Sequence, residues 1–188
     1  MHNYQNFIGI DVSKDHLDIA ILREGEIVNH ERIANNLKTL RAYILSFQET
    51  YKLEESLFCM EHTGMYINWL VLALTEFSCN SWVENPLQIK RSMGVKKLKN
   101  DKVDSKNIAF YTFRFQDKAN LYTPSTEELE VLKTLQTLRR KLVTHRQELE
   151  TYVTEKSQFS KTSIQQLLEE SAKTTLEHLT LRIEEIEK

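Results

Sequence analysis

Four acidic residues of this chain have the types and spacing that metal-assisted phosphate chemistry requires. Asp11 and Glu61 each come directly after a short apolar run of strand character. Asp101 and Asp104 stand three residues apart where a helix is expected to begin, so their side chains would share one helix face. Taken singly, each acid is also explained by a turn, cap or first-turn role. These acids therefore indicate a metal site only if the fold brings their side chains together.

Converging carboxylates repel one another and need a neutralising partner. Hard divalent cations supply one, because Mg²⁺ prefers carboxylate and water oxygens and leaves positions for phosphate oxygens. Two such ions about 4 Å apart hold the attacking and leaving oxygens of a phosphodiester in line. The four acids therefore predict a site for Mg²⁺ or Mn²⁺ if the fold brings them together.

The first part of the chain predicts an α/β domain that would position these acids. An antiparallel meander with a turn at Gly25 is followed by strands that alternate with helices, which indicates a mixed sheet flanked by helices. The expected strands are 7–10, 17–22, 26–30, 56–60 and 81–83, and the expected helices are 37–47, 67–77 and one beginning near 104. Parallel pairing of the first and fourth strands would place Asp11 beside Glu61.

A basic segment follows Pro86 and offers contacts for a nucleic-acid backbone. Its cations are Lys90, Arg91, Lys96, Lys97, Lys99, Lys102 and Lys106, of which all but Lys106 are expected to contact nucleic acid. Contacts of this kind are salt-sensitive because they release counterions. The net charge of the 188 residues is only −2, which argues against a protein that simply coats nucleic acid. The aromatic residues Tyr66, Trp69 and Trp82 are expected in the core rather than as stacking platforms for bases.

Residues 124–188 predict a helical region after a boundary at Pro124. Leucines recur there at three- and four-residue steps along two stretches with a polar break at 157–163, which indicates an α-helical hairpin or coiled coil. Dimerisation through these helices and an intramolecular coiled coil explain the apolar stripes equally well. The chain stops in Glu-rich helix without a cap, so we expect a further domain beyond it.

Several function classes are disfavoured by composition. An actin-like sugar kinase would need glycine-rich phosphate loops, but the four glycines are scattered. The spacing of Cys59 and Cys79 suggests neither a disulfide framework nor a zinc site. No signal peptide or membrane-length apolar run is present, which indicates a cytoplasmic protein without a membrane partner. A non-catalytic module for nucleic-acid binding and dimerisation stays open.

Four stretches together resemble one known family. They are Gly9-Ile10-Asp11-Val12-Ser13-Lys14, Glu61-His62-Thr63-Gly64-Met65-Tyr66, Asn85-Pro86 through Lys90 and Gly94, and Asn100-Asp101-Lys102-Val103-Asp104. Their order and spacing are similar to the N-terminal half of the insertion-sequence-110 family, the DEDD transposases related to the Piv invertase. The segment with Arg140 and Arg146 resembles that family's helical linker, and these two arginines are expected to contact nucleic acid. Ser105 departs from the pattern, where alanine is expected.

The resemblance implies a RuvC-like, ribonuclease-H-type domain over 1–123, followed by a helical linker or dimerisation region over 124–188. It places the metal-binding set on Asp11, Glu61, Asp101 and Asp104, with two Mg²⁺ or Mn²⁺ ions as cofactors. It implies a DNA transposase or recombinase of a prokaryotic cytoplasm that acts at the nucleoid, guided by a structured RNA. The family's C-terminal domain with its nucleophilic serine is expected to be absent from this chain. A RuvC-like nuclease for branched DNA is the closest enzymatic alternative.

Overall fold

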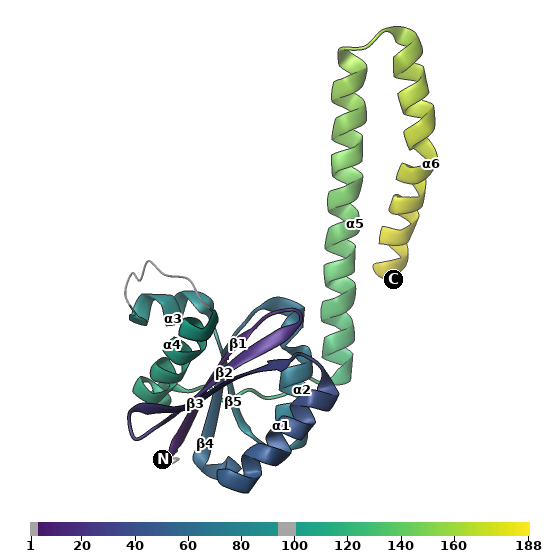
Figure 1. The fold of residues 1–188 in the computed structure, drawn as a ribbon. Helices are drawn as coiled ribbons and strands as arrows, with labels where there is room; N and C mark the ends of the chain where they lie inside the picture. The colour runs from purple at the N-terminus through teal and green to yellow at the C-terminus, as the bar shows by residue number, and fades with distance from the viewer. Residues whose placement is uncertain (1–3, 94–100) are drawn as a thin grey trace. The chain divides into compact units, whose positions relative to one another are not determined.

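The computed structural model describes residues 4–93 and 101–188, and of Met93, Asp101 and Lys102 the backbone only. The chain divides into two units, Met1–Pro124 and Ser125–Lys188. The first unit holds all the strands of the described residues, and the second consists of two long helices (Figure 1).

The first unit is built on a five-stranded sheet in the order β3-β2-β1-β4-β5. The strands are β1 (Asn6–Val12), β2 (His16–Arg23), β3 (Glu26–Ala34), β4 (Ser56–Glu61) and β5 (Asn80–Glu84). β1, β2 and β3 form an antiparallel meander, and Gly25 takes the left-handed backbone conformation (φ 84°) at its second turn. β4 and β5 then add in parallel to β1, so the predicted mixed sheet is confirmed.

One face of the sheet is covered by two amphipathic helices. They are α1 (Leu37–Thr50) and α2 (Asn68–Glu76), the latter preceded by the 3₁₀ turn η2 (Gly64–Ile67). Asn36 caps α1 by accepting a hydrogen bond from the backbone N–H of Thr39 at 3.0 Å, as expected of an asparagine before an apolar helix face. Leu40, Ile44 and Phe47 of α1 pack with the side chains of alternate strand residues. This face forms the larger core of the unit.

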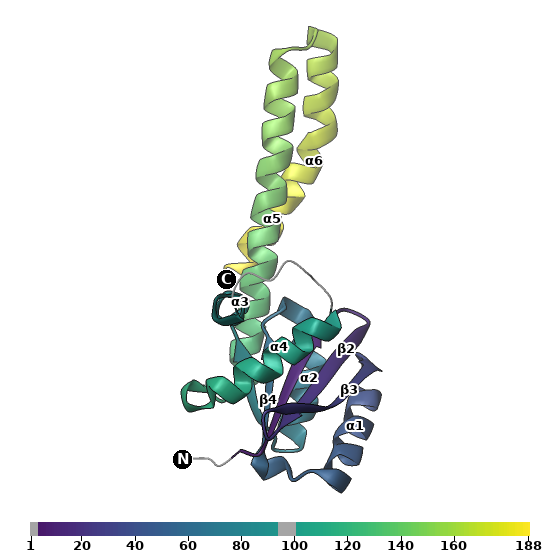
Figure 2. The same ribbon diagram turned by 60° about the vertical axis from the view of Figure 1, so that its left-hand side comes forward.

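The opposite face is covered by α4 (Asp101–Arg114), with the shorter α3 (Pro86–Met93) packed beside it (Figure 2). α4 lies directly on β1 at Gly9. A Cβ atom at this position would stand 2.2 Å from both the backbone nitrogen of Ala109 and the carbonyl oxygen of Ser105. Only glycine leaves room for a helix backbone at this distance, so Gly9 sets how closely α4 approaches the sheet.

Two contacts fix the direction in which α4 crosses β1. Near the middle of both elements, Gly9 meets the turn between Ser105 and Ala109. One turn later, the ring of Phe113 meets that of Phe7 edge-to-face at a centroid distance of 5.1 Å. The helix therefore runs antiparallel to β1, and its first turn points toward the end of β1 that carries Asp11.

The second unit is a helical hairpin made of α5 (Glu127–Gln158) and α6 (Thr162–Ile186). Thr126 caps α5 by accepting from the backbone N–H of Leu129. The Arg139 guanidinium pairs with Glu187 at the end of α6, so the turns of α5 before Arg139 extend beyond its partner helix. Among the described helices of both units, none combines the length and the apolar character needed to span a bilayer.

One core prediction is wrong in part. Trp82 is buried at 3 % exposure, as expected, but Trp69 is 51 % exposed and Tyr66 is 41 % exposed. Both lie on the outward side of η2 and α2, because Ile67, Leu70 and Val71 occupy the inward side. Helical periodicity allows only one of these sides to face the sheet.

We expect Gly9→Ala to destabilise the first unit by about 3 kcal/mol or more, because the new methyl group would collide with helix backbone that cannot rotate away. The matched control is Gly25→Ala, where the added Cβ meets nothing within 4 Å and only the positive φ is strained, at a cost of about 1 kcal/mol. Urea denaturation followed by tryptophan fluorescence measures both, since both tryptophans lie in this unit. Equal losses would contradict the close contact of α4.

Candidate metal centre

Asp11 and Glu61 lie side by side at one edge of the sheet. The parallel register of β1 and β4 pairs Gly9 with Cys59 and Ile10 with Met60, so one further residue on each strand brings Asp11 next to Glu61. Neighbouring strands are about 4.8 Å apart. Both acids are half-buried and both point to the α4 face, because they alternate with Ile10 and Met60 on the opposite face.

The helix that carries the other two acids begins over the same edge. Asp104 is half-buried and lies within the first turn of α4, one residue before Ser105. Because α4 runs antiparallel to β1 and touches it between Ser105 and Ala109, its first turn lies on the Asp11 side of Gly9. Asp101 is the first residue of the helix, and its side chain lies outside the described part of the structure.

The described acids do not form a closed ligand set. Within residues 4–92 and 103–188, no three His, Cys, Asp or Glu side chains converge closely enough to hold a metal ion. The donor set itself fits a hard divalent cation, because Asp11, Glu61 and Asp104 offer only carboxylate oxygens. The structure therefore brings three of the predicted acids to one edge without completing a metal site from them.

A further acid, Asp18, lies directly across from Asp11 on β2. Its side chain is only 2 % exposed and shares the α4 face of the sheet. Arg32, its partner on β3, donates to one carboxylate oxygen from Nε at 3.0 Å and approaches it from Nη2 at 2.7 Å. Nε2 of His30 lies 3.3 Å from the other oxygen. The Asp18 charge is thus balanced from the β3 side, next to Asp11.

Asp18, Asp11 and Glu61 form a row of acids across neighbouring strands, here called the acidic row. Glu84 continues it on the other side of Glu61. The two glutamates are paired across the parallel strands β4 and β5. Glu84 accepts a hydrogen bond from the hydroxyl of Tyr111 at 2.9 Å and from the backbone N–H of Asn85 at 2.6 Å. Burial raises the pKa of the Tyr111 phenol, and the hydrogen bond to Glu84 raises it further, so the phenol keeps its proton and acts as a donor.

The predicted nucleic-acid contacts are distributed over three parts of the chain. Lys90 and Arg91 are exposed on the last turn of α3. Lys96, Lys97 and Lys99 lie outside the described residues, as does the side chain of Lys102. In the helical unit, Arg140 is exposed on α5, and Arg146 lies 3.6 Å from Glu150 one turn further along.

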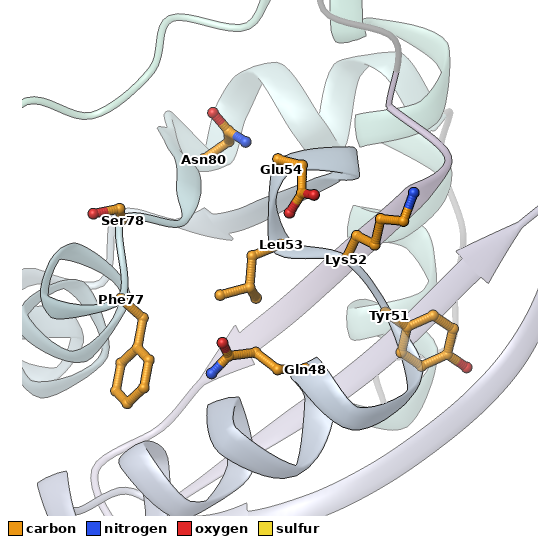
Figure 3. A pocket seen from close by; sticks show the side chains of 8 residues that line it. All are labelled: Gln48, Tyr51, Lys52, Leu53, Glu54, Phe77, Ser78 and Asn80. Carbon is orange, nitrogen blue, oxygen red and sulfur yellow. The ribbon is translucent and has the colours of Figure 1, made fainter.

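A cavity of about 550 Å³ lies away from the acidic row (Figure 3). It is lined by the end of α1, the segment Lys52–Glu54 before β4, and the turn that leads into β5. These segments precede the parallel strands, whereas Glu61 and Glu84 end them. The cavity is therefore at the opposite edge of the sheet and contributes nothing to the carboxylate site.

The sheet order, the helices on both faces and the acids at the ends of β1 and β4 define an α/β fold of the RuvC-like, ribonuclease-H-like class. The fold is similar to RuvC of Thermus thermophilus in complex with a Holliday junction substrate, at a TM-score of 0.51 and 12 % identity over 63 % of this chain and all of the other. A second Thermus thermophilus RuvC structure gives a TM-score of 0.47 and 15 % identity over 61 % of this chain and 98 % of the other. No curated protein sequence matches the chain.

The family model of the DEDD transposases of the insertion-sequence-110 type, described as a transposase, matches residues 8–174. The chain belongs to this transposase family. The match includes residues of all five strands, from position 8 in β1 onward, and extends through α5 into α6. The predicted family and fold class are thereby confirmed.

Sequence reasoning missed the outer members of the acidic row. Asp18 lies within the expected strand 17–22, and Glu84 comes directly after the expected strand 81–83. A detectable signal existed for Asp18, because it is the only charged residue within the otherwise apolar stretch 17–22. Such a residue on a core-facing strand needs a partner. The partner, Arg32, follows from the β2–β3 register.

We expect Arg32→Ala to destabilise the first unit by about 1–3 kcal/mol, because it removes a charged hydrogen-bond donor from a buried carboxylate. Asp18→Asn in the Arg32→Ala background should recover part of this loss, since no buried charge then stays unbalanced. A double-mutant cycle by urea denaturation measures the coupling between the two residues. Additive losses would mean that the pair contributes no mutual stabilisation.

Proposed function

We propose that this chain supplies the divalent-metal site of a DNA transposase that cleaves and transfers DNA strands. One observation carries the proposal: Asp11 and Glu61 come from segments distant in sequence and lie adjacent on one sheet face, beneath the first turn of the helix that carries Asp104. Membership of the transposase family makes DNA the substrate class.

In this proposal Asp11, Glu61, Asp101 and Asp104 hold two Mg²⁺ or Mn²⁺ ions. When bound, the ions neutralise charge on the phosphodiester and lower the pKa of the attacking hydroxyl. The protein's own part is to fix the carboxylates. β1 and β4 hold two of them through the sheet ladder, and α4 holds the other two at a distance from the sheet that Gly9 sets.

The nucleic acids would be bound by cations outside the acidic row. The residues proposed to contact phosphates are Lys90, Arg91, Lys96, Lys97, Lys99, Lys102, Arg140 and Arg146. Because the chain as a whole is weakly acidic, these contacts have to be local, and binding should weaken as salt is added. A structured guide RNA is the second nucleic acid that the family resemblance implies, and it would compete for the same kind of contact.

We expect Asp11→Asn and Asp104→Asn each to weaken Mn²⁺ binding by about 100-fold, because each removes a charged ligand from the shared site. Isothermal titration of the chain with Mn²⁺ measures the affinity. Asp15→Asn is the matched control, since Asp15 is an exposed acid in the turn that follows β1. Without metal, Asp11→Asn should melt at the same or a slightly higher temperature, because repulsion within the row is relieved.

Equal Mn²⁺ affinity in all three variants would overturn the metal site. In that case the acids would be ordinary surface residues, and a non-catalytic role in nucleic-acid binding would explain the chain better. If metal binds, incubation with junction or duplex DNA and Mg²⁺ tests the RuvC-like nuclease, the closest enzymatic alternative. Accumulation of free 5′-phosphate ends would favour that nuclease over the transposase.

The helical unit is proposed to form a homodimer through the part of α5 that α6 does not cover. Val131, Leu135 and Leu138 stand at four- and three-residue steps there and are 53 %, 39 % and 45 % exposed. This spacing is that of a coiled-coil seam. Apolar side chains in such a row are stabilised by a second helix of the same kind.

We expect Leu135→Glu combined with Leu138→Glu to weaken self-association by about tenfold or more, because it places charges in the seam. Sedimentation equilibrium measures the association constant. Leu45→Glu on the outer side of α1, where the leucine is 54 % exposed, is the matched control. An unchanged association constant in the double variant would exclude this seam.

A further inference from the structure

Glu84 joins the segments that carry two of the proposed metal ligands. Its backbone carbonyl accepts a hydrogen bond from the N–H of His62 at 2.9 Å, and His62 directly follows Glu61. Its carboxylate accepts the hydrogen bond of Tyr111 on α4, the helix that carries Asp104. One residue at the end of β5 is therefore bonded both to the end of β4 and to the helix above it.

The same residue also fixes the start of α3. The backbone N–H of Asn85 donates to Glu84, and the Asn85 side-chain oxygen accepts from the N–H of Leu87 at 2.9 Å, as an N-cap does. Pro86 then occupies the first helical position, where a missing N–H costs nothing. Glu84, Asn85 and Pro86 thus determine how the chain leaves β5 and begins α3.

The hydrogen bond between Tyr111 and Glu84 also orients the side of α4 that carries Asp104. Asp104 and Tyr111 are seven residues apart, which is close to two full turns, so they lie on the same side of the helix. Tyr111 is 7 % exposed, and its ring packs against Trp82 at a centroid distance of 5.2 Å and against Phe115 at 4.9 Å. The phenol is therefore held in place, and its hydrogen bond limits rotation of the helix about its axis.

We infer that Glu84 is a positioning residue for the metal site. Through its hydrogen bond with Tyr111, it holds the carboxylate of Asp104 beside that of Glu61. The inference rests on the proposed function. Gly9 determines how close α4 lies to the sheet, and the hydrogen bond between Tyr111 and Glu84 determines which side of the helix faces it. Neither Glu84 nor Tyr111 has to touch the metal for this.

The test compares Tyr111→Phe, Glu84→Ala and Glu84→Gln by calorimetric titration of the chain with Mn²⁺. Tyr111→Phe removes only the donor, and Glu84→Ala removes the acceptor, so each should weaken Mn²⁺ binding by about tenfold. Glu84→Gln keeps one oxygen that can accept from the phenol but loses the second acceptor, which the Asn85 N–H uses, so it should bind Mn²⁺ more tightly than Glu84→Ala. Recovery by the uncharged acceptor distinguishes positioning from a direct charge effect.

Tyr43→Phe is the matched control, because the buried Tyr43 hydroxyl on the other face of the sheet has no hydrogen-bond partner among the described residues. It should leave Mn²⁺ affinity unchanged. If the unmodified chain binds Mn²⁺ but Tyr111→Phe binds it equally well, the positioning role is overturned and the metal site stands. If Glu84→Gln binds as weakly as Glu84→Ala while Tyr111→Phe keeps its affinity, Glu84 acts by its charge and the inference also fails. If the unmodified chain binds no Mn²⁺, the proposed function itself is overturned.

Discussion

The absence of a side chain at Gly9 is the constraint on which the first unit depends. A helix normally packs on a sheet through intervening side chains, but α4 meets β1 backbone to backbone. This contact brings the first turn of the helix down to the level of the strand ends. Asp104 lies on that turn, so the position of an acid on a helix is controlled by a residue in the middle of a strand.

The register of the sheet aligns four acids in a row. Asp18, Asp11, Glu61 and Glu84 come from four adjacent strands and lie on the same face. Hydrogen-bond donors hold the two ends of the row. Arg32 balances Asp18, and Tyr111 together with a backbone N–H holds Glu84. Like charges at this spacing repel, and these donors at the two ends lower the cost of keeping the central pair together.

The elements of the fold were largely predictable because their signals are local. Asn36 before an apolar helix face, Gly25 between strands and the apolar runs that lead into Asp11 and Glu61 each specify an element within a few residues. The sequence placed Asp11 beside Glu61 on the condition that their strands pair in parallel, and the register of β1 and β4 meets this condition. The Tyr111–Glu84 hydrogen bond was not predictable, because nothing local marks two residues 27 positions apart as partners. The exposure of Trp69 was missed because hydrophobicity alone does not state which side of a helix faces the sheet.

The parallel pairing of β1 with β4 has a consequence for the order in which the protein folds. The meander of β1, β2 and β3 is closed by short turns, so its contacts form between neighbours along the chain. Asp11 and Glu61 come together only after a crossover through α1 has brought in β4, and non-local pairings of this kind form late and slowly. A ligand that binds through both acids would therefore bind the complete sheet and not the three-stranded meander alone. Its binding would indicate that folding is complete.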